Sequence, residues 1–233
     1  MGKRAFLFPG QGAQVVGMGK DFFDTYDLAK KRFAEADEAL GYSISKLCFE
    51  GPADQLQLTE HTQPAILTVA VFASELLRAE GIVPEIAAGH SLGEYAALVA
   101  AGVLSFQDAV LLVHKRGAYM QEAVPVGEGA MAAVIGLDDE TIISVCAEAS
   151  SVGAVQAVNF NCPGQTVIAG TAKGVETAVQ RLQEKGAKKA VILPVSAPFH
   201  STLMEPAAKK LAAELDKVEL HDAAFPVVSN YTG

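Results

Sequence analysis

Short apolar stretches alternate with longer amphipathic ones from the beginning of the chain. Ala5–Phe8 is a compact apolar run, which predicts a strand. Apolar residues recur at helical spacing in 28–40 and in 64–80. Gly41 and Gly81 follow these two stretches directly, where a glycine commonly ends a helix. This alternation of strand and helix is typical of a parallel α/β sheet.

A second strand-like stretch, 86–88, leads directly into the sequence Gly-His-Ser-Leu-Gly at 89–93. A helical run follows and extends through Ala101. A strand that turns sharply into a helix would lift the hydroxyl of Ser91 clear of its neighbours, with glycines where a side chain would collide. The context therefore predicts a nucleophile elbow with Ser91 as the catalytic nucleophile.

The pattern changes in the second half of the chain. Ser105 and Asp108 form a pair like a capping box that predicts a helix to about Ala123, and Arg116 lies on it. Pro125, Gly127 and Gly129 then interrupt the periodicity. The order that follows is βαββαβ, which is typical of a ferredoxin-like unit. Its expected elements are strand 131–135, helix 139–149, strand 154–158, strand 166–169, helix 174–185 and strand 189–193.

These patterns predict the α/β class, with a large α/β-hydrolase-like domain that contains a parallel sheet. A small ferredoxin-like domain at 128–195 is inserted into it, so the large domain comprises 1–127 and 196–233. After Ser196 the chain is expected to form a helix over 203–215 and a last strand over 225–229.

Composition narrows the class of protein further. Of the 233 residues, 50% are hydrophobic and 19% are charged, as in a globular chain with a full core, and no apolar run reaches the length of a membrane span. The net charge of −9 disfavours nucleic acid as a partner. Three widely spaced cysteines fit a reducing compartment and argue against zinc. No signal-type segment opens the sequence, so we expect a cytoplasmic protein.

A serine hydroxyl needs a base within hydrogen-bonding reach. Of the five histidines, His61 and His221 lie in polar stretches and His114 lies in the middle of a helix. His200 follows Pro-Phe at the expected return to the large domain, where pockets tend to form. A histidine without a role at the start of a helix remains the alternative for His200. No acidic residue stands out by motif as the third member of a hydrolase triad.

Several motifs occur together in one order, and together they resemble the malonyl-CoA:acyl carrier protein transacylases, the malonyl loaders of bacterial fatty acid synthesis. The resemblance spans the whole chain and supports the inserted ferredoxin-like domain. Its motifs are Phe8-Pro9-Gly10-Gln11-Gly12-Ala13-Gln14, Thr62-Gln63-Pro64-Ala65, Gly89-His90-Ser91-Leu92-Gly93-Glu94-Tyr95, Arg116 and Ala197-Pro198-Phe199-His200-Ser201.

The resemblance implies a ping-pong acyl transfer. Ser91 would attack the malonyl thioester and His200 would take its proton, after which coenzyme A leaves and the phosphopantetheine thiol of acyl carrier protein enters. The backbone N–H groups of Gln11 and Leu92 would form the oxyanion hole. Arg116 would pair with the free malonyl carboxylate, because a guanidinium offers two parallel hydrogen bonds.

The resemblance also implies a substrate preference and a set of partners. The ring of Phe199 would crowd the extra methyl group of methylmalonyl, a preference of about 1–3 kcal/mol. The expected partners are malonyl-CoA and acyl carrier protein, with no nucleic acid, no membrane, and no metal or redox cofactor. We expect a monomer.

Members of the family usually continue well beyond Gly233, and that part normally holds a main-chain carbonyl that orients the catalytic histidine. Two alternatives therefore stay open beside the transferase. One is a serine hydrolase or thioesterase on the same scaffold, and the other is a catalytically inactive truncated fragment.

Overall fold

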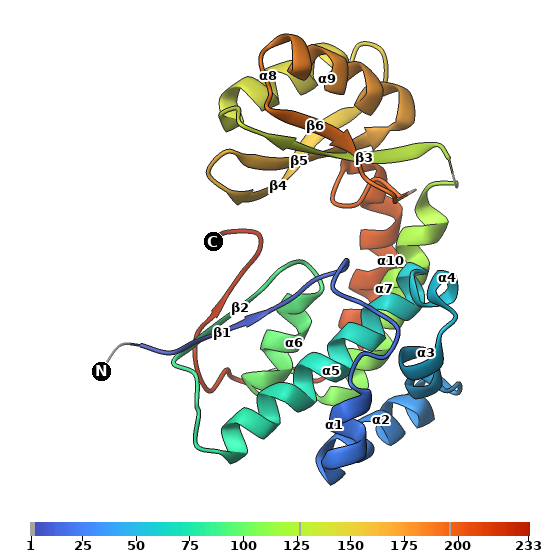
Figure 1. Cartoon of the computed structure of the whole chain (residues 1–233), viewed down its shortest axis with the longest axis vertical. Helices are drawn as coiled ribbons and strands as arrows, with labels where there is room; N and C mark the ends of the chain where they lie inside the picture. The colour runs from blue at the N-terminus through green and yellow to red at the C-terminus, as the bar shows by residue number, and fades with distance from the viewer. Residues whose placement is uncertain (1–2, 126, 196) are drawn as a thin grey trace. The chain divides into compact units, whose positions relative to one another are not determined.

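In the computed structural model, the described residues are 3–125, 127–195 and 197–233. The chain divides into two compact units, Met1–Ala118 with Leu211–Gly233 and Tyr119–Lys210 (Figure 1). The boundaries expected from the sequence, at 128 and 195, fall within the smaller unit, and they stay a prediction. Ser196, the expected point of return to the large domain, lies outside the described residues.

The larger unit contains a parallel sheet, as expected. β1 (Ala5–Phe8) and β7 (Val227–Val228) both pair in parallel with β2 (Ile86–Gly89), which lies between them. Phe8 lies opposite Gly89 in the register of β1 and β2. Both strands therefore end at the same edge of the sheet, where α/β folds commonly place their ligand sites.

Helices make up most of the larger unit, and α6 packs against β1 and β2 (Figure 1). Three short helices, α1, α3 and α4, were not predicted from the sequence, because they are too brief to show periodicity. The helices that begin in this unit's N-terminal part are α1 (Lys20–Thr25), α2 (Asp27–Leu40), α3 (Ile44–Glu50), α4 (Ala53–Leu56), α5 (Thr59–Ala79), α6 (Gly93–Ala100) and α7 (Phe106–Ala123).

Helix α5 begins earlier than the sequence indicated. It starts at Thr59 and not at Pro64, which lies inside the helix. A proline has no N–H, so it leaves the carbonyl four residues earlier without its helical partner. Here that carbonyl belongs to Glu60, and it accepts a hydrogen bond of 3.0 Å from Nδ1 of His114 on α7. A tertiary contact thus supports the first turns of α5, which local sequence signals do not reveal.

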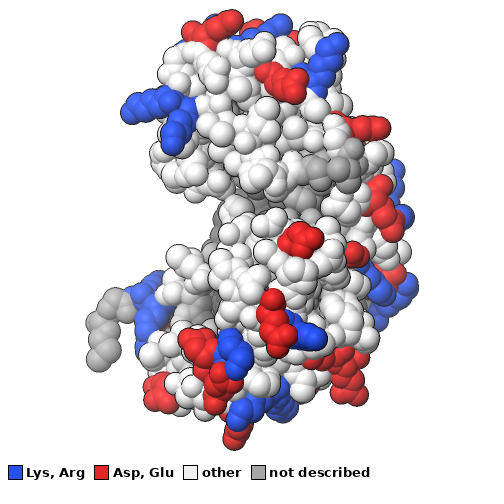
Figure 2. Space-filling view, turned by 45° about the vertical axis from the view of Figure 1, so that its right-hand side comes forward, with Lys and Arg blue, Asp and Glu red and all other residues white. Residues whose placement is uncertain are grey.

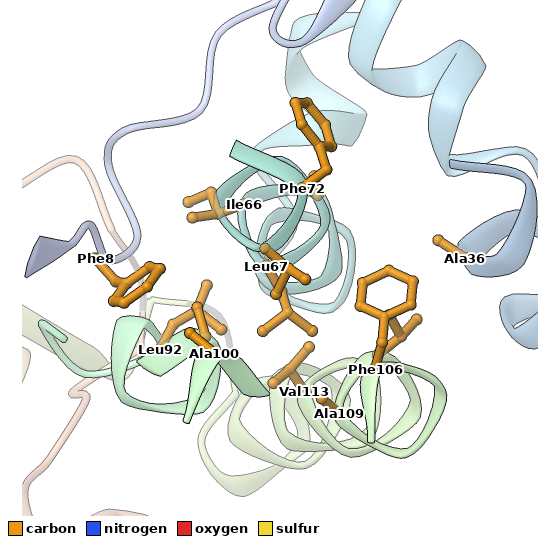
Figure 3. Packing of buried hydrophobic residues seen from close by; sticks show 14 of the residues in the cluster. Phe8, Ala36, Ile66, Leu67, Phe72, Leu92, Ala100, Phe106, Ala109 and Val113 are labelled. Atoms are coloured by element: carbon orange, nitrogen blue, oxygen red, sulfur yellow. The ribbon is translucent and has the colours of Figure 1, made fainter. Parts of the chain in front are cut away.

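The core of the larger unit is formed by side chains from α2, α5, α6 and α7 together with Phe8 of β1 and Ala87 of β2. Phe8 and Leu92 belong to this core and are 6% and 1% exposed. In Figure 3 their side chains lie next to each other and near Ile66 on α5. Because Leu92 is held in the core, the residue before it is turned the other way, toward the edge of the sheet. The same packing that stabilises the fold therefore presents Ser91.

The smaller unit is ferredoxin-like. Its antiparallel sheet has the strand order β4-β5-β3-β6, the order of that fold. Helices α8 and α9 lie together on one face of this sheet (Figure 1). In chain order the elements are β3 (Gly129–Ile135), α8 (Asp139–Ala149), β4 (Val155–Cys162), β5 (Gln165–Thr171), α9 (Ala172–Glu184) and β6 (Lys189–Ile192), followed by the 3₁₀ helix Thr202–Met204 and α10 (Glu205–Leu215).

The surface carries charges of both signs. On the face seen in Figure 2, acidic and basic side chains are interspersed, and no single basic patch dominates it. Among the helices of the described ranges, none combines the length and the apolar character that a membrane span requires.

Candidate active site

Ser91 occupies a strained turn between β2 and α6. Its φ is 49°, in the left-handed region, a conformation that costs a non-glycine residue roughly 1–3 kcal/mol. The turn is tight because its ends touch: a Cβ on Gly89 would lie 1.9 Å from the carbonyl carbon of Gly93. Glycine is therefore required at this point. The strand, turn and helix expected around the Gly-His-Ser-Leu-Gly sequence are all present.

The segment after β1 lies directly against this turn. The backbone N–H of His90 donates to the carbonyl of Phe8 at 3.0 Å. A Cβ on Gly10 would lie only 2.4 Å from the carbonyl oxygen of His90. The two backbones are thus in contact, and the Pro-Gly-Gln sequence brings Gln11 to the same edge of the sheet as Ser91. The side chain of Gln11 donates to Oγ1 of Thr59 at 3.3 Å.

Two backbone N–H groups at this edge, those of Gln11 and Leu92, have no hydrogen-bond acceptor among the described residues. In the ranges that the structure describes, no hydrogen bond uses the N–H of Gln11 or of Leu92 as its donor. The N–H of Leu92 lies at the N-cap of α6, whose axis dipole favours negative charge at that end. These are the properties that an oxyanion hole requires.

Arg116 on α7 reaches the nucleophile candidate directly. Its Nη2 donates to Oγ of Ser91 at 3.1 Å, and its Nη1 donates to Oε1 of Gln63 at 2.9 Å. The guanidinium also lies over the ring of Tyr95, 5.8 Å from its centre. Gly117, the next residue, lets α7 pack closely against α5, because a Cβ there would lie 2.5 Å from the backbone oxygen of Thr59 on α5.

The guanidinium of Arg116 has no anionic partner within the part of the chain that the structure describes. Among the described residues, no carboxylate forms an ion pair with it. Burial lowers its pKa below the usual range, and the nearby Tyr95 and Glu94 oppose that shift. Because a desolvated charge is costly unless it is paired, this arrangement favours a ligand that brings a carboxylate.

The sequence assigned no contact to two residues of this site, Gln63, which lies in one of the family motifs, and Asn230, which lies in none of them. Gln63 is 1% exposed, so its side chain is buried and points at Arg116. Asn230 is separated from Ser91 by most of the chain, yet its side chain accepts a hydrogen bond from the backbone N–H of Ser91 at 2.6 Å. Only the packing of α5 and of the segment after β7 shows that they belong to the site.

His200 and Phe199 lie in the smaller unit. His200 is exposed and has a φ of 65°, so it too adopts a left-handed conformation. Its turn is held by a hydrogen bond of 2.7 Å from Oγ of Ser201 to the carbonyl of Pro198. Phe199 is 9% exposed and packs in the apolar cluster that contains Met131. The assigned roles of His200 and Phe199 stay predictions.

The remaining histidines differ from one another. His114 supports α5 as described above, and His221 is exposed, as expected. His61 was expected at the surface but is partly buried, with its ring 5.3 Å from that of Tyr42.

A family profile described as an acyl transferase domain matches residues 5–232. The chain belongs to this acyl transferase family. The resemblance expected from the motifs is thereby confirmed.

Relatives of this acyl transferase agree closely in sequence and in fold. The chain is 55% identical to the malonyl CoA-acyl carrier protein transacylase of Bacillus subtilis (strain 168), over 99% of this chain and 73% of the relative. It is 52% identical to the protein of the same name from Escherichia coli (strain K12), over 97% and 74%.

Solved structures give the same picture for the acyl transferase. The malonyl CoA-acyl carrier protein transacylase of Coxiella burnetii matches with a TM-score of 0.95 and 46% identity, over 97% of this chain and 72% of that one. A malonyl-transacylase in complex with its type II polyketide synthase acyl-carrier protein also matches with a TM-score of 0.95 and 46% identity, over 98% and 74%.

Proposed function

We propose that this acyl transferase moves a malonyl group from malonyl-CoA to the phosphopantetheine thiol of acyl carrier protein, through an ester on Ser91, for fatty acid synthesis in the cytoplasm. The relatives named above carry this activity in their names. One observation on this chain carries the choice of substrate, namely the partly buried guanidinium of Arg116 hydrogen-bonded to Ser91.

Arg116 accounts for the preference for malonyl over acetyl because a malonyl group carries a free carboxylate and an acetyl group does not. The guanidinium has no carboxylate partner among residues 3–125, 127–195 and 197–233 and donates to two neutral acceptors, Gln63 and Ser91. A malonyl carboxylate would supply the missing anion and could form two parallel hydrogen bonds with it. An acetyl group would leave the cation unpaired, so Arg116 gives selectivity for the dicarboxylic acyl group.

In the first half-reaction the hydroxyl oxygen of Ser91 forms a bond to the thioester carbonyl carbon, and His200 takes its proton. The N–H groups of Leu92 and Gln11 hold the oxyanion, and loss of one such donor typically costs a factor of about 10²–10³ in rate. The C–S bond then breaks, and coenzyme A leaves with the proton from His200. Ser91 is left as its malonyl ester.

In the second half-reaction the same groups act on a new thiol. His200 takes the proton of the phosphopantetheine thiol, whose sulfur attacks the ester carbonyl. The C–O bond breaks, and the proton returns to the oxygen of Ser91. The malonyl group is a thioester both before and after transfer, so the reaction is close to balanced in free energy, and the enzyme must chiefly keep water from the Ser91 ester.

Intact-protein mass spectrometry tests this proposal. The 233-residue chain is mixed briefly with malonyl-CoA and then chased with holo acyl carrier protein. We expect a malonyl adduct on the chain that passes to the carrier. Ser91→Ala should form none, whereas Ser105→Ala, a serine at the start of α7, should behave like the parent.

Other results would point elsewhere. An adduct that disappears in buffer alone as fast as with the carrier would indicate the serine hydrolase or thioesterase alternative. A folded parent chain that forms no adduct would refute the proposed activity for this chain and leave the inactive fragment.

A further inference from the structure

We propose that Asn230 is a positioning residue for Ser91, which acts by continuing the parallel sheet one step past its end. This inference rests on the proposed function as far as catalysis is concerned. The contact itself is a property of the fold, and it can be tested without turnover.

The side-chain amide of Asn230 binds the backbone on both sides of His90. Its Oδ1 accepts from the N–H of Ser91 at 2.6 Å, and its Nδ2 donates to the carbonyl of Gly89, also at 2.6 Å. In a parallel ladder, one residue bonds the carbonyl before and the N–H after the residue it faces. The amide of Asn230 therefore takes the position of a peptide group paired with His90.

This position follows from the register of the sheet. Ala88 is the last residue of β2 that pairs with β7, and its partner is Val228. The backbone of β7 ends there, two residues before Asn230. On the other side of β2, the backbone N–H of His90 is bonded to Phe8 of β1. The Asn230 side chain thus completes on the β7 side a ladder that the backbone completes on the β1 side.

We call the two hydrogen bonds from the Asn230 side chain to Gly89 and Ser91 the clamp. The clamp acts at a turn whose backbone is strained. Ser91 has a φ of 49°, and the close contact between Gly89 and Gly93 permits this turn but does not attract its two ends. Asn230 adds an attractive link between Gly89 and Ser91. Strained functional turns persist only where their surroundings overdetermine them. The clamp therefore holds the nucleophile and the adjacent N–H of Leu92 in one arrangement.

Glu94 in turn holds Asn230. Its Oε2 accepts a hydrogen bond of 3.2 Å from the backbone N–H of Asn230. Glu94 lies in the first turn of α6, the helix that the elbow opens. The helix after Ser91 and the strand segment beside it are therefore tied to each other through Asn230.

Two variants separate the parts of the clamp. Asn230→Ala removes both side-chain hydrogen bonds. Asn230→Asp keeps the acceptor for the N–H of Ser91 but places a carboxylate oxygen against the carbonyl of Gly89. Thr232→Ala, a change at an exposed residue in the same terminal turn, is the matched control.

Amide hydrogen exchange measured by NMR reports directly on the hydrogen bond between the Ser91 N–H and Asn230. We expect exchange at the Ser91 N–H to accelerate about tenfold or more in Asn230→Ala, as after loss of a hydrogen bond. It should accelerate less in Asn230→Asp and not change in Thr232→Ala. Exchange in the core helix α5 should stay the same in all three.

The kinetics of malonyl transfer measure how the loss of these hydrogen bonds affects catalysis. A misplaced nucleophile costs up to about 10²-fold in rate, so kcat should fall by about 10- to 100-fold in Asn230→Ala while KM for malonyl-CoA stays unchanged. Asn230→Asp should recover part of this loss.

Several outcomes would overturn the inference. Parent-like exchange at Ser91 in Asn230→Ala would refute the clamp. Faster exchange at Ser91 with an unchanged kcat would refute the positioning role. If Asn230→Ala does not fold, Asn230→Asp decides both questions. A parent chain without transfer would refute the proposed function, and the exchange data would still decide the clamp.

Discussion

The guanidinium of Arg116 donates a hydrogen bond to the hydroxyl of Ser91 over 3.1 Å. Arg116 lies on α7 and Ser91 lies in the turn between β2 and α6, and Gly117, the residue after Arg116, lets α7 approach α5 closely. A cation so close to the nucleophile, with no carboxylate partner among the described residues, makes substrate choice the most direct property to test.

Replacing Arg116 by alanine should impair malonyl loading far more than acetyl loading. Loss of a charge-assisted hydrogen-bond pair costs about 1.5–3 kcal/mol or more, so we expect malonyl loading of Ser91 to fall at least about tenfold. Acetyl loading should change only a few-fold, because acetyl has no second carboxylate. Rapid-quench mass spectrometry with each acyl-CoA measures both rates.

Arg78→Ala is the control for Arg116→Ala, since Arg78 is exposed on α5 and bonds the carbonyl of Ala100. It should leave the ratio of malonyl to acetyl loading unchanged. Equal losses for the two acyl groups in Arg116→Ala would contradict the assignment of Arg116 to the malonyl carboxylate.

Gln63→Glu should weaken malonyl binding. The new carboxylate would lie at the position of the amide oxygen that now accepts from Arg116 at 2.9 Å. An internal ion pair would then compete with the substrate carboxylate for the guanidinium. We expect KM for malonyl-CoA to rise about tenfold or more, which corresponds to roughly 1.4 kcal/mol. Steady-state kinetics with acyl carrier protein measures it.

The same substitution at an exposed position, Gln57→Glu, controls for added negative charge on this acidic protein. It should leave KM unchanged. A KM in Gln63→Glu that equals that of the parent would show that the substrate carboxylate does not depend on the free guanidinium.

His114→Ala should destabilise the larger unit. The change removes the donor to the carbonyl of Glu60, which Pro64 has already deprived of a helical partner. A partly buried acceptor left unsatisfied costs about 1–3 kcal/mol. Chemical denaturation should show a loss of this size in the free energy of unfolding. His221→Ala, at an exposed site, should stay within about 0.5 kcal/mol of the parent; equal effects of the two changes would refute the supporting role of His114.

The three cysteines should differ sharply in reactivity. Burial raises the pKa of Cys48 to about 12 and that of Cys146 to about 11, so both remain thiols at pH 8 to 9 and are shielded. Cys162 is exposed. We expect iodoacetamide at pH 8 to modify Cys162 alone in the folded protein and all three cysteines in urea. Peptide mapping checks this, and labelling of Cys48 at the rate of Cys162 in the folded chain would contradict it.

The sequence predicted the elements that have strong periodicity or clear end signals. Strand Ala5–Phe8 and helix Asp139–Ala149 have the expected bounds, and α2 ends at Gly41, which has the left-handed conformation expected of a terminating glycine. Short helices such as α3 escaped prediction, because fewer than two turns give no period to detect. The start of α5 was misplaced, since the hydrogen bond that compensates for Pro64 comes from a distant helix.

In the candidate site, too, the sequence indicated some residues and left others to be found from tertiary contacts. Short sequence motifs, one around Gln11 and one around Ser91 and Leu92, marked these three residues, and local steric rules already required glycine around the serine. Nothing local marked Gln63 as the partner of Arg116 or Asn230 as the partner of Ser91.

The sequence by itself determined the family, the two kinds of sheet and the strand–turn–helix that carries Ser91, because these depend on periodicity, glycine positions and motifs within short windows. The tertiary structure decided which side chains meet. Whether Arg116 faces a carboxylate or a substrate pocket, and whether an amide from the end of β7 reaches the elbow, depends on helix packing and strand register. Those contacts join residues far apart in the chain, and their geometry is set only when the core is complete.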